Sequence, residues 1–487
     1  MARGLFTKKA ISTLLKESQD KGQGLKRTLG ALNLTTMGIG AIIGAGIFVL
    51  AGPAAAEFSG PAIVLSLIIV GILCSLVALC YAEFSALIPI SGSAYSYAYA
   101  TMGELVAWII GWGLTLEYLI SSCTVAVGWS GYFVSLMNDC GITIPQALSN
   151  APFTYDPAFG WGPSGSLFNL PALVIVGLIG LMIAVGMKTA AKINDIMVVI
   201  KLSIIVLFIA CGIAFINVEN WKPFIPDNTG FFGQFGWSGI LRGAGVVFFA
   251  FIGFDAVSTL AQEARNPQRD MPKGMLSSLW ISVVAYVLVA LVLTGIVSYT
   301  QLNVPDPIAV AINAMGPGFI WLRYVLKIAI LAGLASVCLV MLMGQTRIFY
   351  TMANDGLLPP LFGKVSKKTG TPLFTTLVVI LIGMLVAALF PVVILAQLVN
   401  MGTLFIFAIV CFGVLVLRYT QPLLHRPFKT PLLPWIPLAG TLACLVLMLA
   451  LPGVTWVQFA AWTLFGCWVY FVYGQKHSRV RNGSKGK

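Results

Sequence analysis

Charged residues are scarce in this sequence. Only 9% of the 487 residues are Asp, Glu, Lys or Arg, whereas 59% are hydrophobic, and the mean hydropathy is +0.94. A soluble globule of this length needs far more polar groups to cover its surface. The composition therefore excludes an ordinary soluble protein and predicts an integral membrane protein.

Residues that carry metal, nucleotide or redox chemistry are also few. The chain has two histidines, His425 and His477, and we find no cluster with the spacing of metal ligands. No P-loop is present, which argues against an ATP-driven pump, and the glycine-rich stretch from Gly38 to Gly46 lacks the spacing of a dinucleotide site. We therefore expect no enzyme activity, no metal and no cofactor, and a gradient as the energy source.

Signals for secretion are missing as well. Of the nine cysteines only Cys140 falls in a predicted exterior loop, so a disulfide framework is not expected. Residues 1–30 are basic and polar and contain no apolar core of a signal peptide. We expect this segment to be cytoplasmic and the first membrane span to begin insertion.

Long apolar runs are what the sequence has in abundance. A helix needs about 20 apolar residues to cross a hydrocarbon core of about 30 Å, and runs near this length recur along the whole chain. The predicted fold is an all-α integral membrane protein with about twelve transmembrane helices. The spans are expected near 33–55, 61–86, 103–136, 169–187, 190–216, 237–262, 276–300, 319–350, 372–391, 393–418, 431–451 and 455–474.

The basic residues follow the loops on one side. With the N-terminus inside, 24 of the 29 Lys and Arg residues fall on the cytoplasmic side, four lie at outer helix ends, and Lys201 remains inside a span. This asymmetry predicts cytoplasmic N- and C-termini by the positive-inside rule. The net charge of +13 is thus a topology signal, and nucleic acid is not an expected partner.

Two predicted spans, the first and the sixth, are unusually rich in glycine. The first contains the run Gly38 to Gly46, and the sixth runs from Gly243 through Gly253 to Asp255. Such glycines can simply permit close helix packing. Their placement five spans apart, however, is typical of a secondary transporter with inverted repeats and broken helices. We expect repeats at 31–216 and 237–419, two further helices at 431–474 and a cytoplasmic tail at 475–487.

Three ionisable residues lie well inside predicted spans: Glu117, Lys201 and Asp255. Each costs about 2.5–3.5 kcal/mol at a helix centre, so each needs a partner, a cavity or a ligand charge. Desolvation disfavours the charged form of a buried lysine, which makes Lys201 a plausible proton carrier. The alternatives are that Lys201 pairs with a carboxylate, that Asp255 caps a half-helix, and that Glu117 bonds a neighbouring hydroxyl.

Several motifs together resemble the amino acid, polyamine and organocation superfamily, and within it the cationic amino acid transporter family. The resemblance covers roughly residues 25 to 475 and implies a LeuT-type fold of five plus five inverted helices, with helices 1 and 6 discontinuous. It rests on Gly38-Ile-Gly-Ala-Ile-Ile-Gly-Ala-Gly-Ile-Phe48, Tyr81-Ala-Glu-Phe, Ile90-Ser-Gly-Ser-Ala-Tyr95, Ile252-Gly-Phe-Asp-Ala-Val-Ser258, Glu263-Ala-Arg-Asn-Pro-Gln268 and Gly344-Gln-Thr-Arg347.

This resemblance implies a substrate held in mid-membrane between helices 1, 3, 6 and 8. Free N–H groups at Gly44, Ala45 and Gly46 are expected to bind the α-carboxylate, because they lie at the positive end of a half-helix. The α-amino group is expected at carbonyls near Ile42, Ile43, Phe249, Ala250 and Ile252.

The remaining site residues are also implied by the resemblance. Glu117 and Asp255 would face a cationic side chain, Phe249 would act as a gate, and Met341 would form the pocket floor. Lys201 matches the lysine that replaces a sodium ion in proton-coupled relatives, and it is expected to donate to carbonyls near Gly40 and Ala41.

The expected function is proton-coupled symport of L-amino acids, with a preference for cationic ones, in the plasma membrane of a bacterium. The expected partners are the amino acid substrate and membrane lipids, and an accessory subunit is left open. An amino acid exchanger and a carrier of small neutral amino acids remain alternatives on the same fold, and a non-transporting nutrient sensor is a distant one.

Overall fold

The computed structural model describes residues 4–19, 27–156, 160–304, 306–366 and 369–482. Almost all of its regular structure is helical. The prediction of an all-α chain missed one antiparallel hairpin, in which β1 (Phe153–Asp156) pairs with β2 (Gly160–Pro163). The hairpin lies between two helices and outside every predicted span, where Gly160 with φ of +78° helps to turn the chain.

The α-helices follow one another along the chain, with long connections from α7 to α8 and from α9 to α10. Their bounds are α1 (Ile11–Gln19), α2 (Ala31–Ile42), α3 (Ala51–Ala54), α4 (Ile63–Leu87), α5 (Ser93–Thr101), α6 (Glu104–Thr115), α7 (Ser121–Asp139), α8 (Leu170–Val185), α9 (Met187–Gly212), α10 (Gly236–Val247), α11 (Pro267–Ile296), α12 (Pro307–Ala314), α13 (Ile320–Asn354), α14 (Leu373–Leu389), α15 (Val392–Thr420), α16 (Trp435–Leu449), α17 (Gly453–Val469), α18 (Gln475–His477) and α19 (Arg479–Asn482).

Short turns of tighter or wider helix interrupt or extend these elements. The π-helical ones are η1 (Gly46–Leu50), η2 (Ala55–Ser59), η4 (Leu116–Ile120) and η13 (Tyr470–Gly474). The 3₁₀ ones are η3 (Gly60–Ala62), η5 (Gln146–Leu148), η6 (Ile213–Phe215), η7 (Val218–Trp221), η8 (Phe248–Phe251), η9 (Asp255–Glu263), η10 (Tyr299–Gln301), η11 (Pro317–Phe319) and η12 (Pro360–Gly363).

Within the described residues, eight helical stretches are long and apolar enough to cross a membrane, and three apolar helices are shorter. The first stretch, Ala31–Leu87, is 57 residues long and contains two of the predicted spans. Every predicted span is mostly helical, and the first and sixth contain non-helical residues in their interiors. The chain is therefore a multi-pass helical membrane protein, while the count of twelve crossings and the inverted repeat stay predictions.

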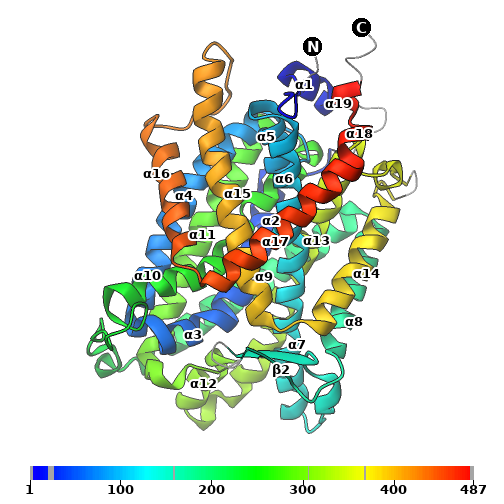
Figure 1. Cartoon of the computed structure of the whole chain (residues 1–487). Coiled ribbons are helices and arrows are strands. Elements are labelled where there is room, and N and C mark those ends of the chain that lie inside the picture. Colours follow the sequence, from blue (N-terminus) through cyan, green and yellow to red (C-terminus); the bar gives the residue numbers. More distant parts are fainter. Residues whose placement is uncertain (1–3, 20–26, 157–159, 305, 367–368, 483–487) are drawn as a thin grey trace.

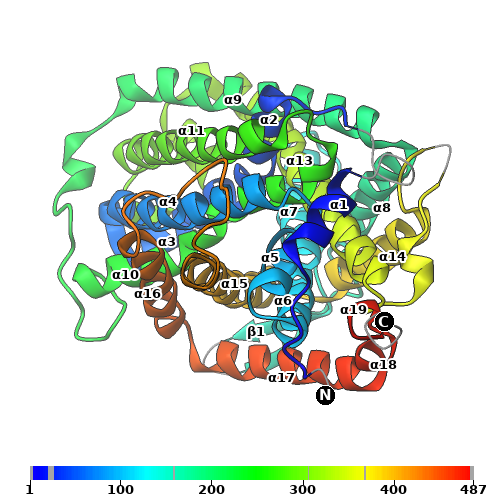
Figure 2. The same ribbon diagram turned by 90° about the horizontal axis from the view of Figure 1, so that it is seen from above.

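The helices form one bundle with α7 and α13 in its middle (Figures 1 and 2). Helix α13 packs against α7, α9 and α2, and α11 packs against α4 and α2. Helices α9 and α17 lie on opposite rims (Figure 2). The first helix α1, the last helix α19 and the connection from α15 to α16 all lie at one end of the bundle (Figure 1), as the prediction of two termini on the same side requires.

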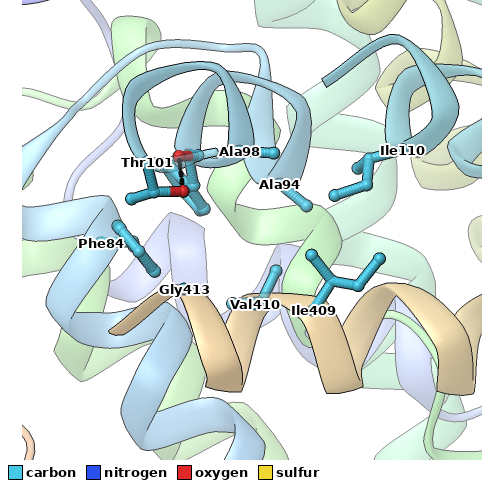
Figure 3. Close-up of a pocket in the computed structure, with 9 residues that line it drawn as sticks. Phe84, Ala94, Ala98, Thr101, Ile110, Ile409, Val410 and Gly413 are labelled. Atoms are coloured by element: carbon cyan, nitrogen blue, oxygen red, sulfur yellow. Dashed lines mark hydrogen bonds between the residues drawn. The ribbon is translucent and has the colours of Figure 1, made fainter. Parts of the chain in front are cut away.

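A narrow apolar pocket lies near that end, between α4, α5, α6 and α15 (Figure 3). Phe84, Ala94, Ile110 and Val410 line it, and it is too small to hold a water molecule. It contains no charged lining residue. It is a packing defect, and the candidate site lies elsewhere, at the two glycine-rich segments.

Candidate functional site

The first glycine-rich span is broken, as the sequence predicts. Helix α2 ends at Ile42, and Ile43 is extended, with φ of −74° and ψ of 103°. The chain resumes as a π-helical turn at Gly46. The N–H groups at the start of a helical segment have no preceding carbonyl within that segment. The break therefore exposes backbone N–H groups in the Gly44 to Gly46 segment to partners outside their own helix, at the place where the substrate carboxylate was predicted.

The sixth predicted span is broken as well. Helix α10 ends at Val247, η8 covers the next turn, and Ile252 is extended, with φ of −63° and ψ of 130°. Gly253 follows with φ of +127°, a conformation that side-chain-bearing residues rarely adopt. The chain then continues as η9, whose nine residues are long for a 3₁₀ helix. Both glycine-rich spans are thus discontinuous.

The two breaks touch each other directly. A β-carbon added at Gly46 would lie 2.1 Å from the Cα atom of Ala250, and one added at Gly253 would lie 2.8 Å from the backbone carbon of Ala41. No side chain fits between backbones at such distances. The glycines therefore allow the two broken segments to approach closely, in addition to giving the backbone conformational freedom.

Tyr286 joins the two breaks from α11. Its hydroxyl lies 2.7 Å from the carbonyl oxygen of Ile42 and 2.8 Å from that of Ala250. A hydroxyl carries a single hydrogen, so it can donate to only one of these carbonyls at a time. Sequence reasoning missed Tyr286, although a buried phenol inside an apolar helix is a signal that a polar partner must be near.

Lys201 reaches the first break from α9. It belongs to a buried stripe with Val198, Ile205 and Phe208, while Val199 and Ile200 on the other face are exposed. This pattern turns the lysine toward the bundle. Its exposed fraction is 0%, so its amine is wholly removed from solvent.

The Lys201 amine donates to two carbonyls of the first break. Its Nζ atom lies 3.1 Å from the oxygen of Gly40 and 2.7 Å from that of Ile43. The resemblance implied carbonyls near Gly40 and Ala41. The acceptors are Gly40 and Ile43, and Ile43 is the residue at which the chain leaves α2. The hydroxyl of Ser336 on α13 lies 3.2 Å from the oxygen of Gly40 and 2.7 Å from that of Gly333, and it can donate to only one of them at a time. The alternative pairing of Lys201 with a carboxylate is wrong for the described part of the chain.

Glu117 and Asp255 form the acidic part of the site. Glu117 lies on the π-helical turn η4, a feature that is frequent at functional sites, and Asp255 is the first residue of η9. Tyr118 donates to Asp255 Oδ2 at 2.6 Å. The two carboxyl groups are close enough to interact electrostatically.

Both carboxyl groups retain unused acceptor atoms. Among the described residues, no hydroxyl, amide or cation bonds either oxygen of Glu117 or the Oδ1 atom of Asp255, and the two carboxyl groups adjoin each other. The alternative in which Glu117 bonds a neighbouring hydroxyl is therefore wrong. Buried carboxyl oxygens without partners are costly, and a ligand cation or a proton would offset the cost.

The other predicted lining residues are buried around the breaks. Phe249 and Ala250 belong to η8, Ile252 follows it, and Met341 lies on α13. Phe249 is 5% exposed and Met341 is 0% exposed, so the region is closed to solvent in this state. Their roles in binding a substrate stay predictions.

Ion pairs flank the site along α13, one on each side. Toward the end that carries α1 and α19, Arg347 on α13 pairs with Glu263 at 3.1 Å, and the carbonyl of Glu263 accepts from the N–H groups of Thr28 and Leu29. Toward the opposite end, Lys327 on α13 pairs with Asp139 of α7. In the sequence, Arg347 and Glu263 stand out only as parts of recognised motifs. Their ion pair could not be predicted, because nothing in the local sequence indicates that the two side chains are close.

The chain is similar to transporters over nearly its whole length. The family model described as amino acid permease matches residues 29–474. The methylthioribose transporter of Bacillus subtilis (strain 168) is 43% identical over 97% of this chain and 98% of that relative. The branched-chain amino acid permease BcaP of the same strain is 42% identical over 99% and 100%.

Cationic amino acid transporters match at lower identity. The vacuolar cationic amino acid transporter 4 of Arabidopsis thaliana is 35% identical over 86% of this chain and 68% of that relative. These relatives are transporters and not enzymes, in agreement with the expectation from the sequence. With its two broken helices and a match from residue 29 to residue 474, the chain belongs to the amino acid permease family.

Proposed function

We propose that the protein is a proton-coupled symporter of L-amino acids in a bacterial plasma membrane, with both termini in the cytoplasm. The observation that supports this most is the Lys201 amine, which donates to Gly40 and Ile43 at the break of the first helix. A titratable group placed on a bistable element can link protonation to opening and closing.

The backbone at the two breaks supplies the amino acid contacts in this proposal. N–H groups of Gly44, Ala45 and Gly46 bind the α-carboxylate at the start of η1. The α-ammonium binds carbonyls of the first and second breaks. Because Tyr286 can donate to only one of its two carbonyl neighbours, the other is available to an ammonium donor.

Proton coupling in this proposal runs through the charge on Lys201. The protonated amine forms charge-assisted hydrogen bonds, which are roughly twice as strong as neutral ones. Loss of the proton toward the cytoplasm weakens the link between α9 and the first break. The end of α2 is then held less tightly, which favours release of the substrate.

Glu117 and Asp255 favour a cationic substrate side chain, because three of their four carboxyl oxygens have no partner within the described chain. The second candidate is a carrier of branched-chain or other neutral amino acids, and it is favoured by the permease at 42% identity. In a neutral carrier these carboxyl groups would hold protons. Binding of arginine, leucine and alanine to the same preparation separates the two.

Replacing Glu117 with glutamine is expected to weaken arginine binding by about tenfold or more, because a charged hydrogen bond is worth about 1.5–3 kcal/mol. Alanine and leucine binding should change by less than about threefold. Thermal stabilisation by each amino acid measures the three affinities. Glu57→Gln is the matched control, since Glu57 is exposed. Equal losses for arginine and alanine would refute the cationic assignment.

Replacing Tyr286 with phenylalanine is expected to lower the affinity for every amino acid by about tenfold, because a buried carbonyl loses its donor and the two breaks lose their bridge. The effect should not depend on the substrate side chain. Tyr324→Phe is the matched control, since that hydroxyl also donates to a carbonyl, at Asp139, but outside the site. A change that is selective for one class of side chain would contradict the backbone role.

Transport in sealed vesicles tests the proposed coupling. Proteoliposomes with an inward proton gradient and no sodium should accumulate substrate, and they should do so without substrate preloaded inside. An exchanger would need internal substrate. A sensor would bind the amino acid without uptake.

A further inference from the structure

An open groove of about 440 Å³ lies away from the candidate site. Its walls are the first turns of α11 and the connection from α15 to α16, which contributes Pro427 and Phe428. This connection lies at the same end of the bundle as α1 and α19 (Figure 1). The positive-inside rule predicts that this end faces the cytoplasm.

The charge of the groove has one sign. Arg269 and Lys273 line it and are exposed, and Gln268 adds an amide donor. No carboxylate lines it, and the nearby Asp270 is 8% exposed. Ammonium, guanidinium and amide donors beside one another match a phosphate group.

The groove continues into an apolar face of α11. Arg269, Lys273, Leu276, Trp280 and Val284 follow one another at intervals of three or four residues, which places them on one side of the helix. Trp280 is 52% exposed and Val284 is 55% exposed. Tryptophan is typical of the membrane interface, and exposed valine beyond it is typical of a lipid-facing surface. The face thus changes from basic to interfacial to apolar along its length.

We propose that this groove binds the phosphodiester headgroup of an anionic phospholipid from the cytoplasmic leaflet. Arg269 and Lys273 contact the phosphate, and the acyl chains follow the exposed face of α11 past Trp280. Basic pockets at the cytoplasmic side of membrane helices bind anionic headgroups in this way. A soluble phosphate compound would use the basic end but would gain nothing from the apolar face.

Because of the position of the groove, a lipid bound there is expected to affect transport. Only residues 264–266 separate the end of η9 from the start of α11, so the groove lies directly beside the second half of the broken sixth span. A lipid held between α11 and the α15–α16 connection would restrain this end of η9. The inference does not depend on the identity of the transported substrate.

The test is lipid binding to the intact protein in detergent, counted by native mass spectrometry. The probes are dioleoylphosphatidylglycerol, dioleoylphosphatidylcholine with the same acyl chains, and glycerol 3-phosphate. Wild-type protein should retain phosphatidylglycerol about tenfold better than phosphatidylcholine, because two basic residues attract the anionic headgroup. Glycerol 3-phosphate in excess should not displace it.

Two variants locate the binding. Arg269→Gln combined with Lys273→Gln should lose about tenfold in retained phosphatidylglycerol. Lys364→Gln combined with Lys476→Gln removes the same charge from exposed residues outside the groove and should retain it. Three results would each overturn the proposal. The wild-type protein could retain the two lipids equally, glycerol 3-phosphate could displace the phosphatidylglycerol fully, or the two double variants could have equal effects.

Discussion

Replacing Lys201 with alanine is expected to abolish uphill accumulation of substrate under a proton gradient. The variant removes a charged donor from two buried carbonyls, those of Gly40 and Ile43, although Gly40 keeps the Ser336 hydroxyl at 3.2 Å. Each lost hydrogen bond to a charged group costs about 1.5–3 kcal/mol. Among the described contacts, Lys201 is the only charged side chain that links α9 to the first break, and the variant removes that link. Gradient-driven uptake should fall by about 100-fold, because losing about 3 kcal/mol of this link changes an equilibrium by about that factor.

The measurement is uptake by proteoliposomes with and without a pH gradient. Lys192→Ala is the matched control, because Lys192 is an exposed lysine on the same helix. Vesicles with Lys201→Ala should take up no more substrate with the pH gradient than without it. Vesicles with Lys192→Ala should accumulate substrate as the wild type does. Accumulation that survives in Lys201→Ala would remove this lysine from the coupling mechanism.

Replacing Gly46 with alanine is the second change with a large expected effect. The new β-carbon would lie 2.1 Å from the Cα atom and 2.7 Å from the nitrogen of Ala250, and backbone atoms cannot swing aside as a side chain can. Overpacking of this kind costs about 1–3 kcal/mol or more. We expect the two breaks to be forced apart, with transport reduced by about tenfold or more and a lower melting temperature.

Other glycines provide a graded series of controls for this prediction. A β-carbon at Gly44 meets only the side chain of Val337, at 2.6 Å, which can adjust, and one at Gly131 meets nothing within 4 Å. Uptake and melting temperature should therefore decline in the order Gly131→Ala, Gly44→Ala, Gly46→Ala. If Gly46→Ala transports as well as Gly131→Ala, the contact between the two breaks is not needed for transport.

The breaks could be predicted from the sequence because their cause is local. Glycine clusters weaken a helix wherever they occur, and two clusters at corresponding places in an apolar chain are visible by inspection. The same holds for Lys201 and for the apolar spans. Their environment, a membrane, allows few structures, so a local pattern is enough to identify them.

Contacts between distant segments could not be predicted in the same way. Tyr286 meets Ile42 across 244 positions, and Tyr118 meets Asp255 across 137. No spacing in the sequence encodes such a pairing. The acceptors of Lys201 were expected near Gly40 and Ala41, and the second one is Ile43, because the residue at which α2 ends decides which carbonyls turn toward α9.

The substrate class was the least constrained by the sequence. Buried carboxyl groups at Glu117 and Asp255 favour a cation, whereas the relatives at 42% and 43% identity carry names of a branched-chain permease and a methylthioribose transporter. A few lining side chains are enough to decide such a preference. The fold and the general function can therefore be established before the substrate.

Proton-driven uptake by the wild-type protein tests the central claim most directly. Sodium-free proteoliposomes with an acidic exterior are supplied with labelled arginine, leucine or alanine, and uptake is followed with and without a protonophore. The proposed function predicts accumulation above the external concentration for at least one amino acid, most strongly for arginine, and its collapse when the protonophore is added. Uptake that requires sodium or internal substrate, and that the protonophore leaves unchanged, would contradict it.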